Sequence, residues 1–259
     1  LAELTGTPVF ETPGYTNFPT DNPLHMGNNL GPYIKDTDLI LVIDSSSWPP
    51  WYPPSSIRDQ AGTRIIFIDP DPLQLKYPVY GYPSDLTIKA DSQVAIKQLN
   101  ELLETANRDD EAIKIRKKLW AEEHRRIREG NKIEALATKD KIPIDPKWLC
   151  YCINQVIDEN TIIVNETITH GNIIHKMIES NRTRPGTRYE STGPVAHTGL
   201  GQGLGIALGV KLAKPDRKVM TLIGDGTFNY NPVPAAFGAS QEYNLPIMTI
   251  IFNNQCYAA

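Results

Sequence analysis

The stretch Val219-Met-Thr-Leu-Ile-Gly-Asp-Gly226 decides the fold class of this chain. An almost entirely apolar run, typical of a buried strand, leads directly into Gly224-Asp225-Gly226. A second apolar run, Ile247 to Phe252, leads in the same way into Asn253-Asn254. In open α/β sheets, ligands bind beyond the carboxyl ends of the strands. We therefore predict that the two polar clusters lie side by side at one edge of a sheet.

The two clusters supply the oxygen donors that Mg²⁺ prefers. Asp225 offers a carboxylate, Asn254 offers an amide oxygen, and the neighbouring backbone offers carbonyl groups. The two glycines beside Asp225 let the backbone approach a bulky anion closely. An isolated Gly-Asp-Gly would indicate an ordinary tight turn, but the Asn-Asn pair favours a metal-bridged diphosphate site.

Apolar runs divide the chain into two α/β units. In residues 1–105, Leu39–Asp44 and Arg64–Asp69 have the pattern of buried parallel strands, and residues 91–103 carry a helical apolar stripe. Residues 145–259 alternate in the same way, with strands at 161–165, 219–223 and 247–252 and helices near 145–159, 171–180, 200–213 and 232–243. This alternation predicts parallel sheets with right-handed crossovers.

Residues 106–144 form a charge-dense segment between the two units. Acidic and basic side chains alternate there at helical neighbour spacing, as in Glu122 with Arg126. The pattern predicts a solvated helical linker. A nucleic-acid patch is disfavoured because acids interleave the bases.

Composition excludes several classes of protein. The chain has 259 residues, of which 40% are hydrophobic and 22% charged, and its net charge of −4 gives no reason to expect nucleic acid or membrane as a partner. No apolar run is long enough to span a bilayer. Cys150, Cys152 and Cys256 are typical of free thiols, which predicts a cytoplasmic location, and they do not form the ligand pattern of a zinc site.

The segments that flank the Gly-Asp-Gly and Asn-Asn pairs resemble those of a known family of enzymes. Gly224-Asp225-Gly226 and Asn253-Asn254 are preceded by a glycine-rich segment, His197–Ala213, and by Pro215-Asp-Arg217, while Pro8–Gly14 and Asn22–Gly27 begin the chain. In this order the segments resemble thiamine diphosphate-dependent enzymes of the acetolactate synthase and benzoylformate decarboxylase group.

The resemblance implies a fold, a cofactor and an assembly. The fold is two doubly wound parallel-sheet α/β domains: a central Rossmann-like domain (1–105) and a thiamine diphosphate-binding domain (145–259, C-terminally incomplete), joined by the charged linker. The cofactors are thiamine diphosphate and Mg²⁺, and the substrate is a small 2-oxo acid. A homodimer or homotetramer with the site at the subunit interface is expected. Some relatives bind FAD in the central domain, but residues 1–105 show no glycine-rich phosphate loop, so FAD is disfavoured.

The resemblance also assigns roles to individual residues. The metal ligands would be the side chains of Asp225 and Asn254 and the backbone carbonyl of Cys256. The remaining cofactor contacts would come from residues at both ends of the site: Thr169, Gly226, Thr227 and Tyr257, with Thr198, Gly199 and Leu200 at the aminopyrimidine. Leu200 would separate the two cofactor rings; the alternative for it is a plain core position.

The segment contains candidates for only some of the catalytic groups that the resemblance implies. His170 and His197 are candidate proton-transfer residues, with satisfied polar groups at strand ends as the alternative. The family's activating glutamate is expected on an N-terminal domain outside this segment, and Glu166, in the predicted rim loop 165–170, is not that residue.

The reaction therefore stays open at this stage. The implied chemistry is 2-oxo acid decarboxylation, carboligation or both. A 2-hydroxyacyl- or oxalyl-coenzyme A lyase and a non-catalytic regulatory relative are the alternatives. The isolated segment is expected to be inactive.

Overall fold

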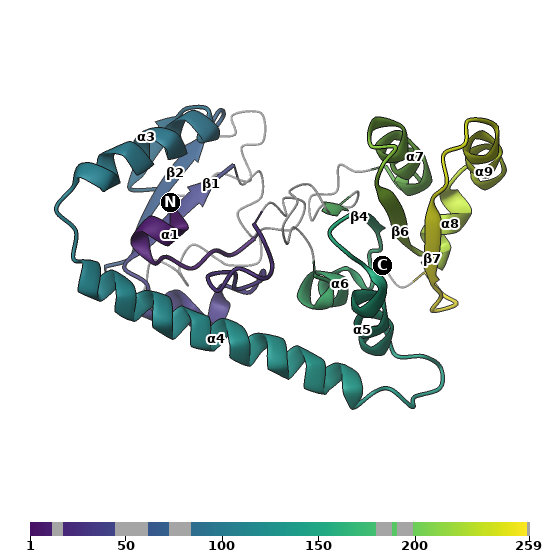
Figure 1. Ribbon diagram of the computed structural model, residues 1–259, viewed down its shortest axis with the longest axis horizontal. Coiled ribbons are helices and arrows are strands. Elements are labelled where there is room, and N and C mark those ends of the chain that lie inside the picture. Colours follow the sequence, from purple (N-terminus) through teal and green to yellow (C-terminus); the bar gives the residue numbers. More distant parts are fainter. Residues whose placement is uncertain (12–17, 45–61, 73–83, 180–187, 191–198, 258–259) are drawn as a thin grey trace.

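The computed structural model of the protein describes residues 1–11, 18–44, 62–72, 84–179, 188–190 and 199–257. Two parallel sheets dominate it, and one long helix spans the distance between them (Figure 1). This arrangement confirms the predicted α/β class. The domain boundaries at 105 and 144 stay predictions.

The first sheet has three parallel strands in the order β1-β2-β3: β1 (Leu39–Ile43), β2 (Arg64–Asp69) and β3 (Leu86–Lys89). Ile40 and Val42 of β1 pack with Ile65 and Phe67 of β2 and with Ile34. Ile34 belongs to the 3₁₀ helix η1 (Gly31–Asp36), which therefore covers one face of this sheet. The short helix α1 (Ala2–Thr5) and the helix α3 (Ser92–Thr105) complete this part of the chain, and the Asp91 side chain caps α3, as the sequence predicts.

The linker forms one continuous helix, α4 (Asp110–Leu136), which begins after the capping side chain of Asp109. It contacts α1 at one end and α5 (Pro146–Val156) at the other. Within this helix Arg126 binds Glu123, three residues earlier, with both guanidinium contacts between 2.6 and 2.7 Å. Glu123 is preferred because it also faces the Tyr33 hydroxyl, 2.5 Å away, so that one carboxylate satisfies both donors.

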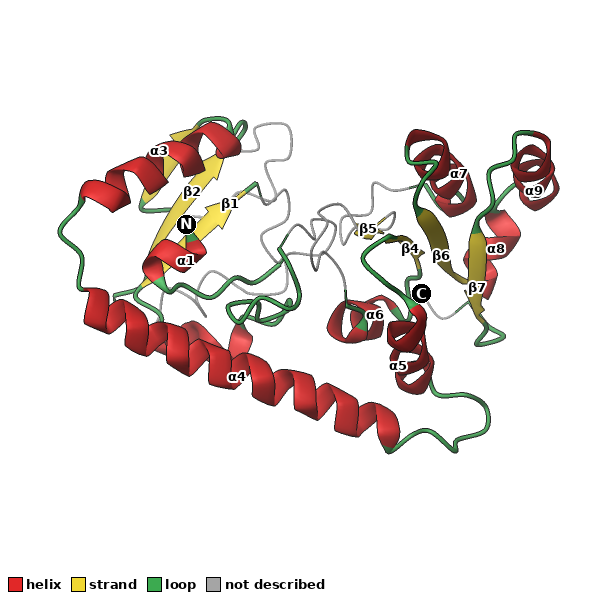
Figure 2. Cartoon of the chain, in the orientation of Figure 1, coloured by secondary structure: helices red, strands yellow, loops and turns green. Residues whose placement is uncertain are grey.

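The second sheet has four parallel strands in the order β5-β4-β6-β7. They are β4 (Thr161–Glu166), β5 (Arg188–Glu190), β6 (Lys218–Gly224) and β7 (Met248–Phe252). The helices between them are α6 (Gly171–Met177), α7 (Gly203–Ala213), α8 (Asp225–Tyr230) and α9 (Val233–Glu242), shown with the strands in Figure 2.

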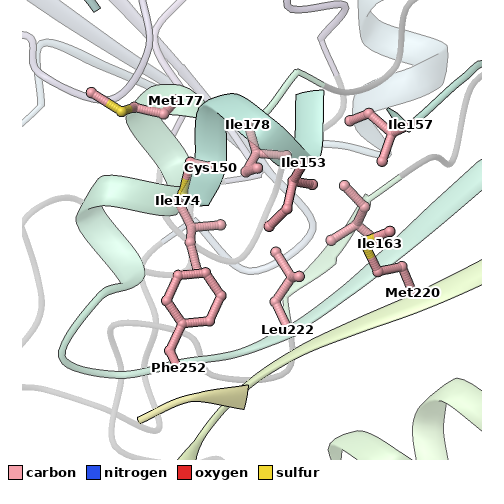
Figure 3. Packing of buried hydrophobic residues seen from close by; sticks show 10 residues of the cluster. All are labelled: Cys150, Ile153, Ile157, Ile163, Ile174, Met177, Ile178, Met220, Leu222 and Phe252. Carbon is pink, nitrogen blue, oxygen red and sulfur yellow. The ribbon is translucent and has the colours of Figure 1, made fainter. Parts of the chain in front are cut away.

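Helices cover both faces of the second sheet. On one face, Cys150 and Ile153 of α5 and Ile174 of α6 pack on Leu222 and Phe252 of the strands (Figure 3). On the other face, Ala207 of α7 packs on Val164 and Val219. Because neighbouring residues of a strand point to opposite faces, both cores are built from the same strands. The second sheet is therefore doubly wound, as expected.

No helix in the described residues combines the length and the hydropathy that a membrane crossing requires. All three cysteines are free thiols; Cys150 is buried in the core of Figure 3 and Cys256 is exposed.

Candidate functional site

The second sheet contains a topological switch point between β4 and β6. After β4 the chain turns to α6 on one face, whereas after β6 it continues through α8 to α9, which contacts α7 on the other face. The two strands are neighbours, with Glu166 in register with Ile223. Connections that leave in opposite directions open a crevice at the carboxyl ends of the strands, and ligands bind there in open α/β sheets. The fold therefore defines this edge as the candidate site.

Both polar clusters predicted from the sequence lie at this edge. Gly224, the last residue of β6, is in register with Phe252, the last residue of β7. Asp225 directly follows β6 and Asn253 directly follows β7, so the two residues leave the sheet side by side. This confirms the predicted neighbourhood of Gly-Asp-Gly and Asn-Asn, while the ligand roles of the individual residues stay predictions.

The Asn-Asn pair forms a tight polar turn. The side-chain oxygen of Asn253 accepts a hydrogen bond from the Gln255 amide at 2.9 Å, and that of Asn254 accepts one from the Cys256 amide at 3.1 Å. Gln255 has a φ of 57°, in the left-handed region. The Asn254 oxygen and the Cys256 carbonyl each have two lone pairs, so both retain acceptor capacity for a cation.

The donor set fits Mg²⁺ better than a softer metal. Asp225 and Asn254 are partly exposed at the edge, and neither side chain is in the hydrophobic core. Within the described ranges, no three His, Cys, Asp or Glu side chains gather in a metal-binding group. A cation at this edge would therefore rely on one carboxylate, one amide oxygen and a carbonyl, with the remaining positions left for phosphate oxygens and water.

Tyr257 packs against the Gly-Asp-Gly turn. A Cβ added at Gly226 would lie 2.8 Å from the Tyr257 ring, so a glycine is needed for this contact. The Tyr257 ring also meets Tyr230 edge-on, with 6.3 Å between the ring centroids. The structure thus brings Tyr257 together with Gly226, as a shared cofactor contact requires.

The glycine-rich segment begins its helix later than predicted. We expected a helix from residue 200, but α7 begins at Gly203. Gly201 has a φ of 92°, which a helix cannot contain, and a Cβ there would lie 2.4 Å from the Tyr230 carbonyl oxygen. Gly199 and Leu200 are therefore exposed in a loop, and Leu200 is 41% exposed, which argues against the plain core alternative.

The end of β4 is buried beneath this loop. Asn165, Glu166 and Thr167 are all at most 2% exposed, so they are not rim residues as we expected of segment 165–170. Within this segment the residues that reach the surface are the later ones: Thr169 is exposed and His170 is partly exposed before α6. The His170 ring lies 5.6 Å from the ring of Phe252, next to the Asn-Asn turn. His197 and Thr198 lie outside the described residues.

The sequence analysis did not predict the structural roles of two residues at this site, Glu166 and Asn231. The Glu166 carboxylate receives the backbone amides of Gly201, Gln202 and Gly203 at 2.8–2.9 Å. Asn231 donates to Glu166 at 3.0 Å and accepts from the Leu204 amide at 3.1 Å. The available signal was a carboxylate at the end of an apolar strand, which requires partners when it is buried.

The fold is that of an α/β protein with Asp225 and an Asn-Asn turn at the carboxyl ends of neighbouring strands, and the comparisons with known proteins add to this description. Residues 170–259 match the family described as thiamine pyrophosphate enzyme, C-terminal TPP binding domain. The chain is 29% identical over 197 residues to the probable acetolactate synthase large subunit of Methanococcus aeolicus, covering 74% of this chain and 31% of that protein.

Two further similarities agree with this match. Over 139 residues the chain is 30% identical to 2-hydroxyacyl-CoA lyase 2 of Bos taurus, covering 52% of this chain and 21% of that protein. The structure of a thiamine diphosphate-dependent 4-hydroxybenzoylformate decarboxylase from Rhodococcus jostii superposes with a TM-score of 0.70 at 23% identity, covering 99% of this chain and 45% of that chain. At this identity the superposition shows the fold.

Residues 170–259 therefore carry the C-terminal TPP binding domain of the thiamine pyrophosphate enzymes, and the chain is similar to acetolactate synthases and to benzoylformate decarboxylase. It spans between about a fifth and a third of the length of these curated relatives.

Proposed function

We propose that the protein carrying this chain is a thiamine diphosphate- and Mg²⁺-dependent enzyme that decarboxylates a 2-oxo acid, with or without carboligation. The observation that carries the proposal is the register of Gly224 with Phe252, which sets Asp225 beside the Asn-Asn turn at the switch point. The matched cofactor-binding family supports the choice of thiamine diphosphate as the ligand.

Different residues at this edge of the sheet would bind the metal and the diphosphate. Asp225, the Asn254 side chain and the Cys256 carbonyl would hold Mg²⁺, which neutralises the diphosphate. Gly226 and Thr227 lie in the first turn of α8, where backbone amides have no partner within the helix and can donate to diphosphate oxygens. Thr169 lies exposed on the β4 side of the crevice and would add a hydroxyl donor.

The other end of the cofactor would meet the glycine-rich loop. Leu200, exposed in the turn before α7, would separate the cofactor rings, and Gly199 leaves the backbone accessible to the aminopyrimidine. When bound, thiamine diphosphate supplies a nucleophilic carbon and an electron sink for a carbanion. His170, whose ring lies beside that of Phe252, would exchange a proton near the substrate.

Cleavage of a 2-hydroxyacyl-coenzyme A thioester is the second candidate reaction. The similarity to 2-hydroxyacyl-CoA lyase 2 is as high in identity as that to the acetolactate synthase, although it covers less of the chain. A non-catalytic relative would keep the fold and lose turnover. Incubation of the intact protein with a panel of 2-oxo acids, and separately with a 2-hydroxyacyl thioester, distinguishes the three by their products.

Removal of the Asp225 carboxylate tests the cofactor site directly. We expect Asp225→Asn in the intact protein to weaken Mg²⁺-dependent thiamine diphosphate binding on the order of 100-fold, because loss of an outer-sphere partner alone costs 10–100-fold. Calorimetric titration with and without a chelator measures this. Asp140→Asn, whose side chain is 88% exposed and lies outside the site, is the control. Unchanged affinity in Asp225→Asn would contradict the assignment.

A further inference from the structure

Glu166 is a buried carboxylate to which the proposed chemistry assigns no role. It is 0% exposed, and its two oxygens receive four N–H donors. The amides of Gly201 and Gln202 bind Oε1, while the Gly203 amide and the Asn231 side chain bind Oε2. An ionised carboxylate is an acceptor with about four lone-pair positions, so its capacity is filled by this arrangement.

The backbone donors come from the turn that enters α7. The first amides of a helix have no partner within the helix and attract negative charge. Here the side chain of Glu166 at the end of β4 occupies that position. One carboxylate at the end of β4 therefore holds three consecutive backbone amides of this turn.

Asn231 connects the same turn to the Gly-Asp-Gly-Thr segment. Its side-chain oxygen accepts from the Leu204 amide, and its side-chain nitrogen donates both to Glu166 and to the Thr227 carbonyl at 3.0 Å. Thr227 and Asn231 are each 6% exposed, so these bonds are shielded from water. Such a satisfied buried network rigidifies the elements that it joins.

Steric contacts leave the network little room to shift. A Cβ at Gly203 would lie 2.4 Å from a Glu166 oxygen, and one at Gly201 would lie 2.4 Å from the Tyr230 carbonyl oxygen. The backbone is thus in close contact with the Glu166 carboxylate at Gly203 and with the Tyr230 backbone at Gly201.

We propose that Glu166 and Asn231 are positioning residues that lock the loop of Gly199 and Leu200 to the turn of Asp225–Thr227. The inference rests on the proposed function, in which that loop meets the aminopyrimidine end of thiamine diphosphate and that turn meets the diphosphate end. The network then sets the relative position of the two cofactor ends, on which the reactive ring geometry depends. Small losses of such geometry reduce rate far more than affinity.

The test replaces the network's polarity without changing its size. In Glu166→Gln, the new amide group faces N–H donors whichever way it turns, so the loop is displaced. We expect kcat to fall by about tenfold or more at saturating thiamine diphosphate and Mg²⁺, with the substrate KM changed by less than about threefold. The near-ultraviolet circular dichroism of the bound cofactor should change as well.

A double substitution then reverses the donor and acceptor roles. Asn231→Asp alone places a second carboxylate against that of Glu166, and we expect it to lower kcat more than Glu166→Gln does. When Glu166→Gln and Asn231→Asp are combined, the new side-chain amide donates to the new carboxylate, so we expect part of both kcat and the dichroism signal to return. If Glu166→Gln does not fold, Asn231→Ala replaces it as the test, because it leaves the backbone bonds of Glu166 in place. It should likewise lower kcat and change the dichroism of the bound cofactor.

Asn154→Ala is the matched control for a purely structural role. Asn154 also joins two elements, donating to the Met177 carbonyl at 2.6 Å and accepting from the Glu179 amide at 3.0 Å, and it lies on the α5 and α6 side. It should lower the melting temperature and leave the cofactor signal intact.

The outcomes separate the two proposals. If the Glu166 and Asn231 variants lose only melting temperature, as Asn154→Ala does, the positioning role is overturned while the proposed function stands. If the unaltered protein fails to bind thiamine diphosphate with Mg²⁺, the proposed function falls, and the positioning role falls with it.

Discussion

At the scale of single residues, the candidate site depends on glycines at positions where no side chain fits. Gly201 has a left-handed φ of 92° and no room for a Cβ beside the Tyr230 carbonyl. Gly203 has no room beside Glu166. These contacts depend on residues far apart in the sequence, so the glycines were recognisable from the sequence but their partners were not.

Gly201→Ala should therefore destabilise the protein. Strained φ and the backbone overlap each cost on the order of 1–3 kcal/mol, which a urea unfolding series would measure. Gly130→Ala is the control, because Gly130 lies within α4 with nothing within 4 Å of an added Cβ. It should gain up to about 1 kcal/mol of helix stability. Equal stability of the two variants would contradict the geometry at Gly201.

Leu200 allows a test of cofactor positioning by a side chain. Leu200→Ala should lower kcat about tenfold or more while thiamine diphosphate affinity changes by less than about threefold, because the metal and diphosphate contacts remain. Leu212→Ala, on the outer surface of α7 and 68% exposed, is the matched control. Unaltered turnover in Leu200→Ala would remove the ring-separating role.

At the scale of elements, the strands and helices with strong apolar patterns were predicted well. The strands β1, β2, β4, β6 and β7 all lie within a residue or so of the predicted ranges. The strand β3 was missed, because Leu86–Lys89 is short and its outer residues are exposed. The late start of α7 was also missed, since only the Tyr230 contact reveals that Gly201 must be left-handed.

The docking of α4 has an acid dependence that can be measured. Hydrogen bonds from Arg126, together with the Tyr33 hydroxyl, hold the pKa of Glu123 at about 2, below its ordinary value of 4.5. A carboxyl whose pKa is depressed in the folded state stabilises the fold above its unfolded pKa, and this stability is lost as the pH falls through the folded pKa. The loss should therefore extend from about pH 4.5 down to about pH 2.

Glu123→Gln should be less stable than the unaltered protein near neutral pH, and the difference should shrink as the pH falls. Urea midpoints at about pH 5 and about pH 3 measure this. The surface ion pair with Arg126 is screened, so the effect should be modest. Glu122→Gln changes the exposed neighbouring carboxyl and serves as the control. A constant difference across this range would contradict the depressed pKa.

At the scale of the whole molecule, the strand order explains why the site lies where it does. The chain passes from β4 to β5 and then returns across β4 to β6, which creates the switch point. The sequence predicted the parallel strands but not their order, since order depends on long-range packing of α6 and α7 on opposite faces. The neighbourhood of β6 and β7 was predictable because consecutive strands are commonly adjacent.

The last prediction concerns the chain on its own. We propose that the group activating the aminopyrimidine comes from outside these 259 residues, in another domain or subunit, since the chain spans about a third of its acetolactate synthase relative. The isolated chain should then show no carbon dioxide release from any 2-oxo acid. It should also tend to aggregate, because β7 is an edge strand of the described sheet with Met248 and Ile251 at 56% and 41% exposure.

The intact protein, by contrast, should sediment as a homodimer or larger and turn over at composite sites. Sedimentation velocity at several concentrations, combined with the carbon dioxide assay on the same fractions, measures both properties. Mixing Asp225→Asn protein with a variant inactivated on the pyrimidine side should restore part of the activity if subunits exchange, because each hybrid dimer then contains one intact site. Turnover by the isolated chain, or full activity in a monomeric fraction, would contradict the composite site.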